Sequence, residues 1–156
     1  MFSCTGYAAK SADQKLAPFT FERRDAGPKD VAIEILFCGV CHSDLHTVRN
    51  EWKNTLYPSL PGHEIVGIVT EVGAAPGSTG ARFSVGDRVG VPWLGWTCGE
   101  CTFCRSGREN LCDRARFTGY DIDGGFAEYT VADARFCFAL PDTYTDVSAA
   151  PLLCAG

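Results

Sequence analysis

The chain has 156 residues, 46% of them hydrophobic, and a formal net charge of −5 at pH 7, which is enough apolar material for one compact domain with a core. Its Lys and Arg residues are scattered rather than gathered in a basic stripe, and no apolar run approaches the length of a membrane span, so neither nucleic acid nor a membrane is favoured as a partner. The first residues lack the positive start and long apolar core of a signal peptide, and we therefore expect a cytoplasmic protein.

The first predicted element is a β-strand over residues 31–38. Apolar residues recur there at every second position, which predicts one fully apolar face, and the strand leads to Cys41. Residues 43–52 are polar and helical in pattern, with Ser43 expected as the N-cap and with Leu45, Val48 and Trp52 near one face. Two prolines in residues 57–62 end this predicted helix.

The remaining predicted elements are also mostly strands. Residues 65–72 form a β-rich run, and Gly67 within it is expected at a bend or bulge. Residues 73–80 have the composition of a surface loop, to which we assign no chemistry. Further strands are expected after the turn at 85–89, up to Val91, and at residues 126–131 and 136–140. Beyond Pro141 we expect helical or irregular structure.

A thiol and an imidazole stand 22 residues apart at Cys41 and His63. Both are zinc ligands, and a catalytic zinc leaves one corner of its tetrahedron to water or substrate, so the two residues need only one further protein ligand. Cys154, in the apolar closing segment, is the residue we predict for that place. Together the three would form a catalytic zinc site.

A second set of thiols is more specific. Four cysteines follow one another at spacings of two, two and seven residues, namely Cys98, Cys101, Cys104 and Cys112. Such a set can enclose one zinc ion completely, which is typical of a structural site, although two disulfides or an iron–sulfur cluster use similar spacings. The odd total of nine cysteines favours metal over disulfides. Four nearby arginines could offset the thiolate charge: Arg105, Arg108, Arg114 and Arg116.

These motifs resemble a known family. The segments Cys-Gly-Val-Cys-His-Ser-Asp-Leu-His, Pro-Gly-His-Glu, Val-Gly-Asp-Arg-Val and Leu-Leu-Cys-Ala-Gly, together with the four-cysteine loop, are similar to the N-terminal part of zinc-dependent medium-chain alcohol dehydrogenases, in their cinnamyl-alcohol and bacterial primary-alcohol branches. The resemblance covers essentially the whole chain. It implies a mainly β fold over residues 1–156, a GroES-like and partly open β-barrel, with a structural-zinc lobe at residues 98–112.

The resemblance also implies a role for each residue of the two sites, with two zinc ions per chain. Cys41, His63 and Cys154 would bind the catalytic zinc, and the four spaced cysteines the structural one. Glu64 would approach the catalytic zinc and assist ligand exchange, or only support the ligands from behind. Asp44 would hold the far ring nitrogen of His63 and fix its tautomer.

The resemblance further implies oxidation of an alcohol to an aldehyde or ketone, reversibly, with NAD or NADP. Zinc would act as a Lewis acid on the substrate oxygen, and a relay from Ser43 through the cofactor ribose to His46 would carry the proton away. His42 would contact the cofactor pyrophosphate. Trp52 and Trp93 would line the substrate pocket and favour small primary or aromatic alcohols and aldehydes.

Two departures from the family limit the resemblance. The segment between Val72 and Gly86 is a few residues longer than usual, which touches no predicted ligand. More importantly, no Gly-x-Gly-x-x-Gly turn occurs, so we expect a fragment that lacks the Rossmann domain, is inactive alone and belongs to a homo-oligomer when full length. The alternative is a stand-alone zinc-binding GroES-like interaction module. An iron–sulfur electron carrier is a third reading, which predicts a coloured protein.

Overall fold

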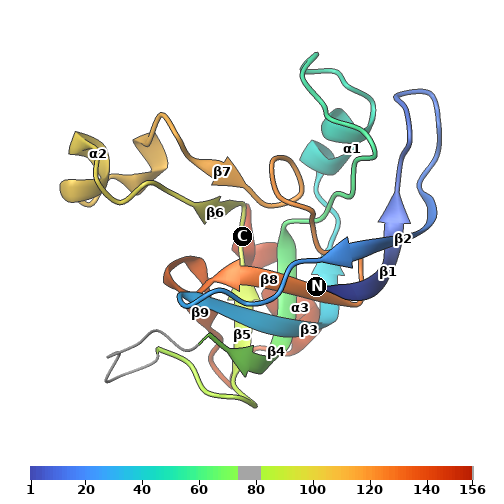
Figure 1. Ribbon diagram of the computed structural model, residues 1–156. Coiled ribbons are helices and arrows are strands. Elements are labelled where there is room, and N and C mark those ends of the chain that lie inside the picture. The colour runs from blue at the N-terminus through green and yellow to red at the C-terminus, as the bar shows by residue number, and fades with distance from the viewer. Residues whose placement is uncertain (74–81, 156) are drawn as a thin grey trace.

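A five-stranded antiparallel sheet forms the centre of the computed structural model, which describes residues 1–73 and 82–155. Its strand order is β8-β3-β4-β5-β9 (Figure 1). The strands are β3 (Asp30–Gly39), β4 (Glu64–Val72), β5 (Arg88–Val91), β8 (Tyr129–Asp133) and β9 (Phe138–Ala139). The 3-10 turn Ala134–Phe136 separates β8 from β9, so the strands predicted at 126–131 and 136–140 are present but shorter and shifted.

Two smaller sheets flank the central one. The hairpin of β1 (Phe2–Ala8) and β2 (Ala17–Arg23) was not predicted from the sequence. The pair β6 (Leu94–Trp96) and β7 (Arg116–Phe117) carries a lobe with α2 (Thr102–Arg105) and the 3-10 turn Glu109–Leu111. Figure 1 shows this lobe projecting away from the central sheet, as the resemblance implies.

The inward-facing residues of the central strands form the core, because they are β-branched and apolar. Val31, Ile33, Ile65, Val69 and Val89 are all fully buried. In β3 and β4, Ile33 stands opposite Val69 in the register. Burial of each such side chain contributes roughly 1.5–3 kcal/mol. The packing of β3, β4 and β5 therefore stabilises the centre of the domain.

The predicted apolar face of residues 31–38 is wrong beyond Ile35. Register shifts interrupt the β3–β4 pairing between Ala32 and Ile33 and between Ile35 and Phe37. A bulge of this kind turns the following side chain toward the other face, and Phe37, predicted on the apolar face, is 44% exposed. Gly67 pairs with Ile35 beside the second shift, where a Cβ would lie 2.3 Å from the Glu34 carbonyl oxygen, so its predicted place at a bulge is confirmed.

The helices are short. Besides α2 in the lobe they are α1 (His42–Val48) and α3 (Asp146–Ala149), and α3 continues into the 3-10 turn Ala150–Leu153. The prediction that Ser43 is the N-cap of α1 is wrong. Cys41 holds that position, and Asp44 accepts a hydrogen bond from the Cys41 N–H. None of the helices in the described residues could cross a membrane. Except for Gly73, the loop predicted at 73–80 lies outside the described residues.

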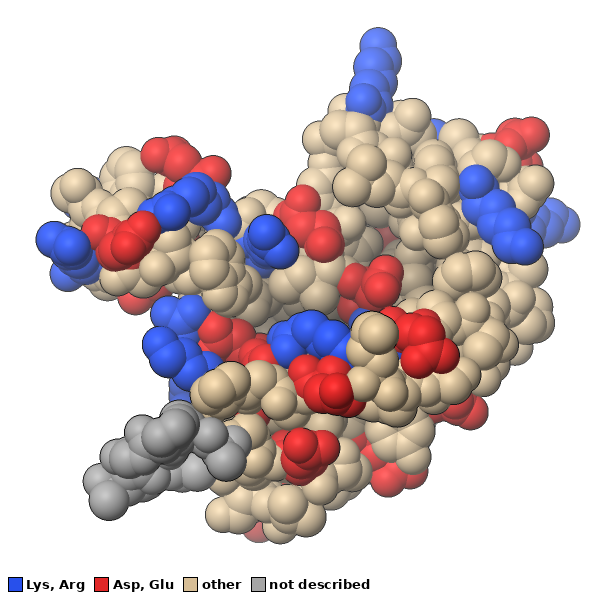
Figure 2. Space-filling view, viewed as in Figure 1, with Lys and Arg blue, Asp and Glu red and all other residues tan. Residues whose placement is uncertain are grey.

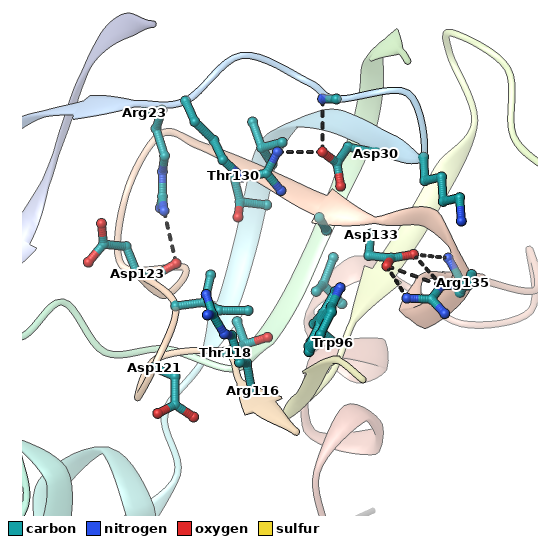
Figure 3. Close-up of a pocket in the computed structure, with 18 of the residues that line it drawn as sticks. Arg23, Asp30, Trp96, Arg116, Thr118, Asp121, Asp123, Thr130, Asp133 and Arg135 are labelled. Atoms are coloured by element: carbon teal, nitrogen blue, oxygen red, sulfur yellow. Dashed lines mark hydrogen bonds and ion pairs between the residues drawn. The ribbon is translucent and has the colours of Figure 1, made fainter. Parts of the chain in front are cut away.

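A groove of about 850 Å³ separates the lobe from the central sheet. The space-filling view shows both signs of charge along it (Figure 2). Residues of β8 line one side and residues of β6 and β7 the other (Figure 3). Acidic and basic side chains therefore face each other across the root of the lobe.

Candidate catalytic and structural metal sites

The β3–β4 ladder brings Cys41 and His63 together. Gly39, at the end of β3, pairs with Glu64, the first residue of β4, so residues just after the one strand and just before the other meet at the same end of the sheet. Cys154 arrives from the opposite end of the sequence. It follows the turn Ala150–Leu153, which packs on β4 and β5, with Leu153 beside Gly90.

The resulting donor atoms fit a tetrahedral zinc. The Sγ atoms of Cys41 and Cys154 lie 3.8 Å apart, and the ligand atoms of Cys41, His63, Glu64 and Cys154 all lie within 4.8 Å of one another. Zinc–sulfur bonds of about 2.3 Å at tetrahedral angles place two thiolates roughly 3.8 Å apart. The chain thus gathers two thiols, an imidazole and a carboxylate around one point.

Asp44 organises this cluster from behind. Its carboxylate is buried and accepts hydrogen bonds from Cys41 N at 2.9 Å, Gly62 N at 2.9 Å and His63 Nδ1 at 3.1 Å. Burial works against the charged imidazole, but the hydrogen bond and charge of Asp44 outweigh it and raise the pKa of His63. With Nδ1 held by Asp44, the Nε2 atom of His63 is left for a metal.

The two thiols of this cluster differ in acidity. Partial burial works to raise the pKa of Cys41, but hydrogen bonds from the backbone and hydroxyl of Ser43, and from His63 and Cys154, hold that pKa below its usual value. Burial and the neighbouring Cys41 thiol raise the pKa of Cys154 to about 11. Ser43 follows Cys41 by two residues, in the first turn of α1.

Glu64 reaches the same cluster because Gly39 has no side chain. A Cβ at Gly39 would lie only 1.9 Å from Glu64 Oε2, so glycine there makes room for the carboxylate. Burial raises the pKa of Glu64, although the charge of His63 opposes the rise. The carboxylate therefore lies among the ligand atoms rather than in solvent.

His46 lies in α1, one helical turn after His42. Its Nδ1 atom pairs with Glu51, and its ring lies 4.6 Å from that of His42. The hydrogen bond from His46 is the main cause that lowers the pKa of Glu51. Sequence reasoning missed Glu51, although it stands only five residues after His46. His42 itself is exposed, beside a cleft of about 750 Å³ that Lys15 and Arg49 also line.

Aromatic side chains form one wall beside the metal ligands. Trp93 lies 4.9 Å from the His63 ring, and Tyr120 lies 5.9 Å from both Trp93 and Trp52. Phe117 stacks on Trp93 at 5.0 Å. The structure thus brings the two predicted tryptophans to the same wall, joined by two aromatic residues that sequence reasoning missed.

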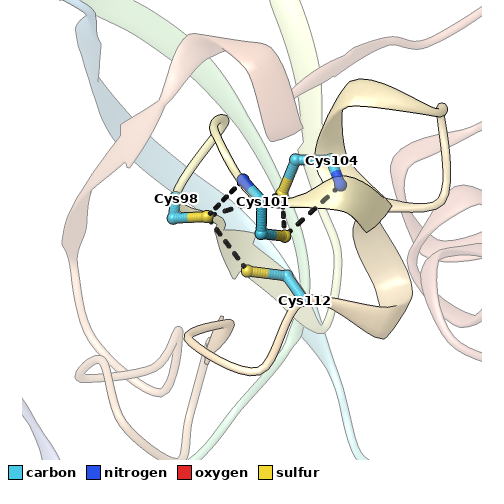
Figure 4. A group of neighbouring side chains, drawn as sticks. All are labelled: Cys98, Cys101, Cys104 and Cys112. Atoms are coloured by element: carbon cyan, nitrogen blue, oxygen red, sulfur yellow. Dashed lines mark hydrogen bonds between the residues drawn. The ribbon is translucent and has the colours of Figure 1, made fainter.

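The four cysteines of the lobe meet at its centre (Figure 4). Their Sγ atoms are 3.8 Å apart for Cys98 and Cys104, 3.5 Å for Cys101 and Cys104, and 3.6 Å for Cys98 and Cys112. These separations match the edge of a four-thiolate zinc tetrahedron, roughly 3.8 Å. They are far longer than a disulfide bond of about 2.05 Å, so the disulfide alternative is wrong.

The thiols of the lobe differ in acidity. A backbone hydrogen bond from Cys104 works to lower the pKa of Cys101, but burial and the neighbouring thiols of Cys104 and Cys98 raise it to about 11. Backbone hydrogen bonds, the largest from Glu100, lower the pKa of Cys98 to about 6. Arg114 pairs with Glu100, whose backbone makes the hydrogen bond that contributes most to lowering the Cys98 pKa. Arg108 and Arg116 instead lie over aromatic rings, those of Phe103 and Trp96. The cluster could therefore hold a zinc ion.

The central sheet with its projecting cysteine lobe defines a GroES-like domain. The family model described as the alcohol dehydrogenase GroES-like domain matches residues 27–142. The chain therefore belongs to this family, and the predicted mainly β, GroES-like fold and family resemblance are confirmed.

Relatives of known name agree with this membership. The chain is 47% identical to cinnamyl alcohol dehydrogenase 8 of Arabidopsis thaliana and 46% identical to a probable mannitol dehydrogenase of Fragaria ananassa, over 97% of this chain and 43% of each relative. Among solved structures it is similar to a cinnamyl alcohol dehydrogenase of Sorghum bicolor, with a TM-score of 0.92, 40% identity and coverage of 99% and 45% of the two chains.

A second solved structure, the CAD of Helicobacter pylori complexed with NADP(H), gives a TM-score of 0.91 at 36% identity, with 99% of this chain and 46% of that chain covered. The chain thus spans less than half the length of the relatives it matches.

Proposed function

We propose that residues 1–156 are the catalytic domain of an NAD(P)-dependent zinc alcohol dehydrogenase, which converts an alcohol reversibly to an aldehyde or ketone. The observation that carries this proposal is the convergence of Cys41, His63, Cys154 and Glu64, with Asp44 behind His63. A purely structural ion has no need of an exchangeable fourth position. The names of the cinnamyl alcohol dehydrogenase relatives support the same activity.

In this proposal Cys41, His63 and Cys154 hold the catalytic zinc. A zinc ion at this point would supply the Lewis acidity that makes an alcohol proton easier to remove. Glu64 lies close enough to enter and leave the fourth position when substrate and water exchange. The hydrogen bonds that hold the pKa of Cys41 below its usual value favour the thiolate, which is the form that binds metal.

The proton leaves through Ser43 and His46. Ser43, in the first turn of α1 beside Cys41, would take the substrate proton while its own hydroxyl proton passes through the cofactor ribose to His46, which releases a proton to solvent because imidazole titrates near neutral pH. Glu51 pairs with the Nδ1 atom of His46 and orients its ring. A bound nicotinamide cofactor would supply the hydride acceptor, and His42, Lys15 and Arg49 give its pyrophosphate a basic cleft.

The aromatic wall sets the substrate class. Trp93 covers one side of His63, and Tyr120 and Trp52 extend that surface away from the ligands. Flat rings of this kind leave room for an unbranched or aromatic alcohol and gain from stacking on an aromatic substrate, by about 0.5–1.5 kcal/mol per pair. We therefore propose small primary or aromatic alcohols and the matching aldehydes as substrates.

The four-cysteine lobe would hold a second, structural zinc, which gives two ions per chain. We further propose that the full-length protein is cytoplasmic, where thiol ligands stay reduced, and that it forms homo-oligomers.

Zinc content tests the metal proposal. We expect two zinc ions per purified chain by elemental analysis, and one after Cys154→Ser or Cys104→Ser, whereas Cys4→Ser, outside both sets, should keep two. Cys104→Ser should also lower stability, because a structural zinc contributes folding free energy. A parent chain with one zinc and a readily alkylated Cys41 would count against the catalytic site.

Activity tests the enzyme proposal in the full-length protein. We expect primary or aromatic alcohols to drive reduction of NAD or NADP. A full-length protein that holds both zinc ions but reduces neither cofactor with any such alcohol would instead support the alternative of a zinc-binding interaction module. A strong visible absorption with iron in place of zinc would identify an iron–sulfur carrier.

A further inference from the structure

The groove at the root of the lobe contains a cation that the proposed reaction does not use. Arg135 lies in the 3-10 turn directly after β8, next to Asp133 in the lining of the groove (Figure 3). From the central sheet its side chain reaches across to β6, where the lobe begins. No sequence motif singles it out, because it stands 23 residues after Cys112.

Arg135 is held firmly on the sheet side. Its Nε and Nη2 atoms donate to the Asp133 carboxylate, at 3.1 Å to Oδ1 and 2.7 Å to Oδ2. Asp133 is buried, and it also caps the turn by accepting from the Arg135 N–H at 3.0 Å. This two-point pairing fixes the plane of the guanidinium, so the remaining donors point in a set direction.

The remaining donors point at the lobe. Nη2 donates to the Thr97 carbonyl oxygen at 3.2 Å, one residue before the first cysteine. Nη1 lies 3.2 Å from the place where a Cβ of Gly99 would be, inside the turn that joins Cys98 to Cys101. Gly99 has φ +72°, a conformation that glycine adopts freely. A side chain there would crowd the guanidinium, so glycine suits both the turn and the approach of Arg135.

The charges favour this approach. Four thiolates around Zn²⁺ carry a formal net charge of about −2, and nearby cations are the usual compensation. Arg114, paired with Glu100, lies within the lobe, and Arg135 approaches the turn at Gly99 from the sheet side of the groove. The pairing with Asp133 is the largest cause that raises the pKa of Arg135, and the Cys104 and Cys98 thiols add to it.

We propose that Arg135 is a positioning residue for the structural-zinc lobe, because it hydrogen-bonds both Asp133 beside the central sheet and the Thr97 carbonyl oxygen at the root of the lobe. This inference rests on the proposed function in one respect, namely that the four cysteines bind zinc. It adds a coupling: how long the lobe keeps its metal depends on a residue of the sheet.

The test measures zinc release from the chain to a chromogenic chelator. A Cys154→Ser background removes one ligand of the catalytic site, so that the measured zinc comes from the lobe. In that background we expect Arg135→Gln to release zinc about tenfold faster, the lower end of the 10–100-fold effects of residues that support metal ligands, since Arg135 is partly exposed. Arg135→Lys keeps the charge but not the planar guanidinium, and its rate of zinc release should lie between those of the parent and of Arg135→Gln.

Arg116→Gln is the matched control, because Arg116 lines the same groove but lies over the Trp96 ring. It should release zinc at the parent rate. If Arg135→Gln also releases zinc at the parent rate while the lobe is loaded, the inference is overturned and the proposed function stands. If Arg135→Gln does not fold, Arg135→Lys decides: release faster than from Arg116→Gln supports the inference, and the parent rate overturns it. A parent lobe without zinc would refute the metal proposal itself.

Discussion

Replacement of Asp44 by asparagine should weaken both the fold and the catalytic zinc site. The Asp44 carboxylate accepts three hydrogen bonds in a buried place, from Cys41 N, Gly62 N and His63 Nδ1. Asparagine has nearly the same shape, so the change tests charge and acceptor number rather than packing. Its single acceptor oxygen and its NH₂ group cannot serve all three donors.

The size of the effect follows from those contacts. A hydrogen bond to a charged group contributes about 1.5–3 kcal/mol, and a buried donor without a partner costs about 1–3 kcal/mol. We expect Asp44→Asn to lower the free energy of unfolding by about 2–4 kcal/mol. For a chain of this size that corresponds to a fall in Tm of roughly 4–16 °C. Zinc affinity at the catalytic site should fall about 10–100-fold, because His63 loses its orienting partner.

The assay combines thermal unfolding with competitive zinc titration of the purified chain. Asp13→Asn is the matched control, since Asp13 is exposed and bonds only Ser11 among the described side chains, and it should leave Tm and both zinc affinities unchanged. The four-cysteine lobe should keep its zinc in both variants. An Asp44→Asn protein with the parent's Tm and the parent's catalytic-zinc affinity would refute the reasoning.

Three further predictions concern the proton path, the isolated chain and a thiol outside both sites. In the full-length enzyme, His46→Gln should slow turnover and shift its pH profile more than it weakens alcohol binding, and Ser43→Ala should be harsher; an unchanged profile in steady-state kinetics would remove His46 from the relay. The 156-residue chain should bind zinc yet oxidise no alcohol at a useful rate, because holding nicotinamide against the substrate lowers the barrier to hydride transfer by roughly 7–11 kcal/mol. Micromolar binding and steady turnover in a titration with NAD and NADP would contradict this. Burial raises the pKa of Cys137 to about 12, so in the native chain at pH 8 iodoacetamide should label it only after unfolding, and mass spectrometry that finds it labelled as fast in the folded chain would disprove that protection.

Local sequence determined the parts of the molecule whose chemistry depends on spacing along the chain. The pairs of cysteines two residues apart can only form a tight turn around a common centre, so the four-cysteine set was readable without a structure. The alternation in residues 31–35 likewise predicted a strand, because side chains on a strand point to opposite faces in turn. The ligand set Cys41, His63 and Cys154 was predicted, and the structure brings its atoms together, while its catalytic role stays a prediction.

Tertiary structure decided whatever depends on register and on contacts between distant segments. The bulge in β3 exposed Phe37 against the alternation, because one extra residue turns the next side chain to the other face. Tyr120 joins Trp52 to Trp93 only because the chain returns from the lobe toward α1. Arg135 meets the cysteine lobe across a groove between two separate sheets. Such contacts leave no local pattern, since a sequence specifies them only through the packing of the whole domain.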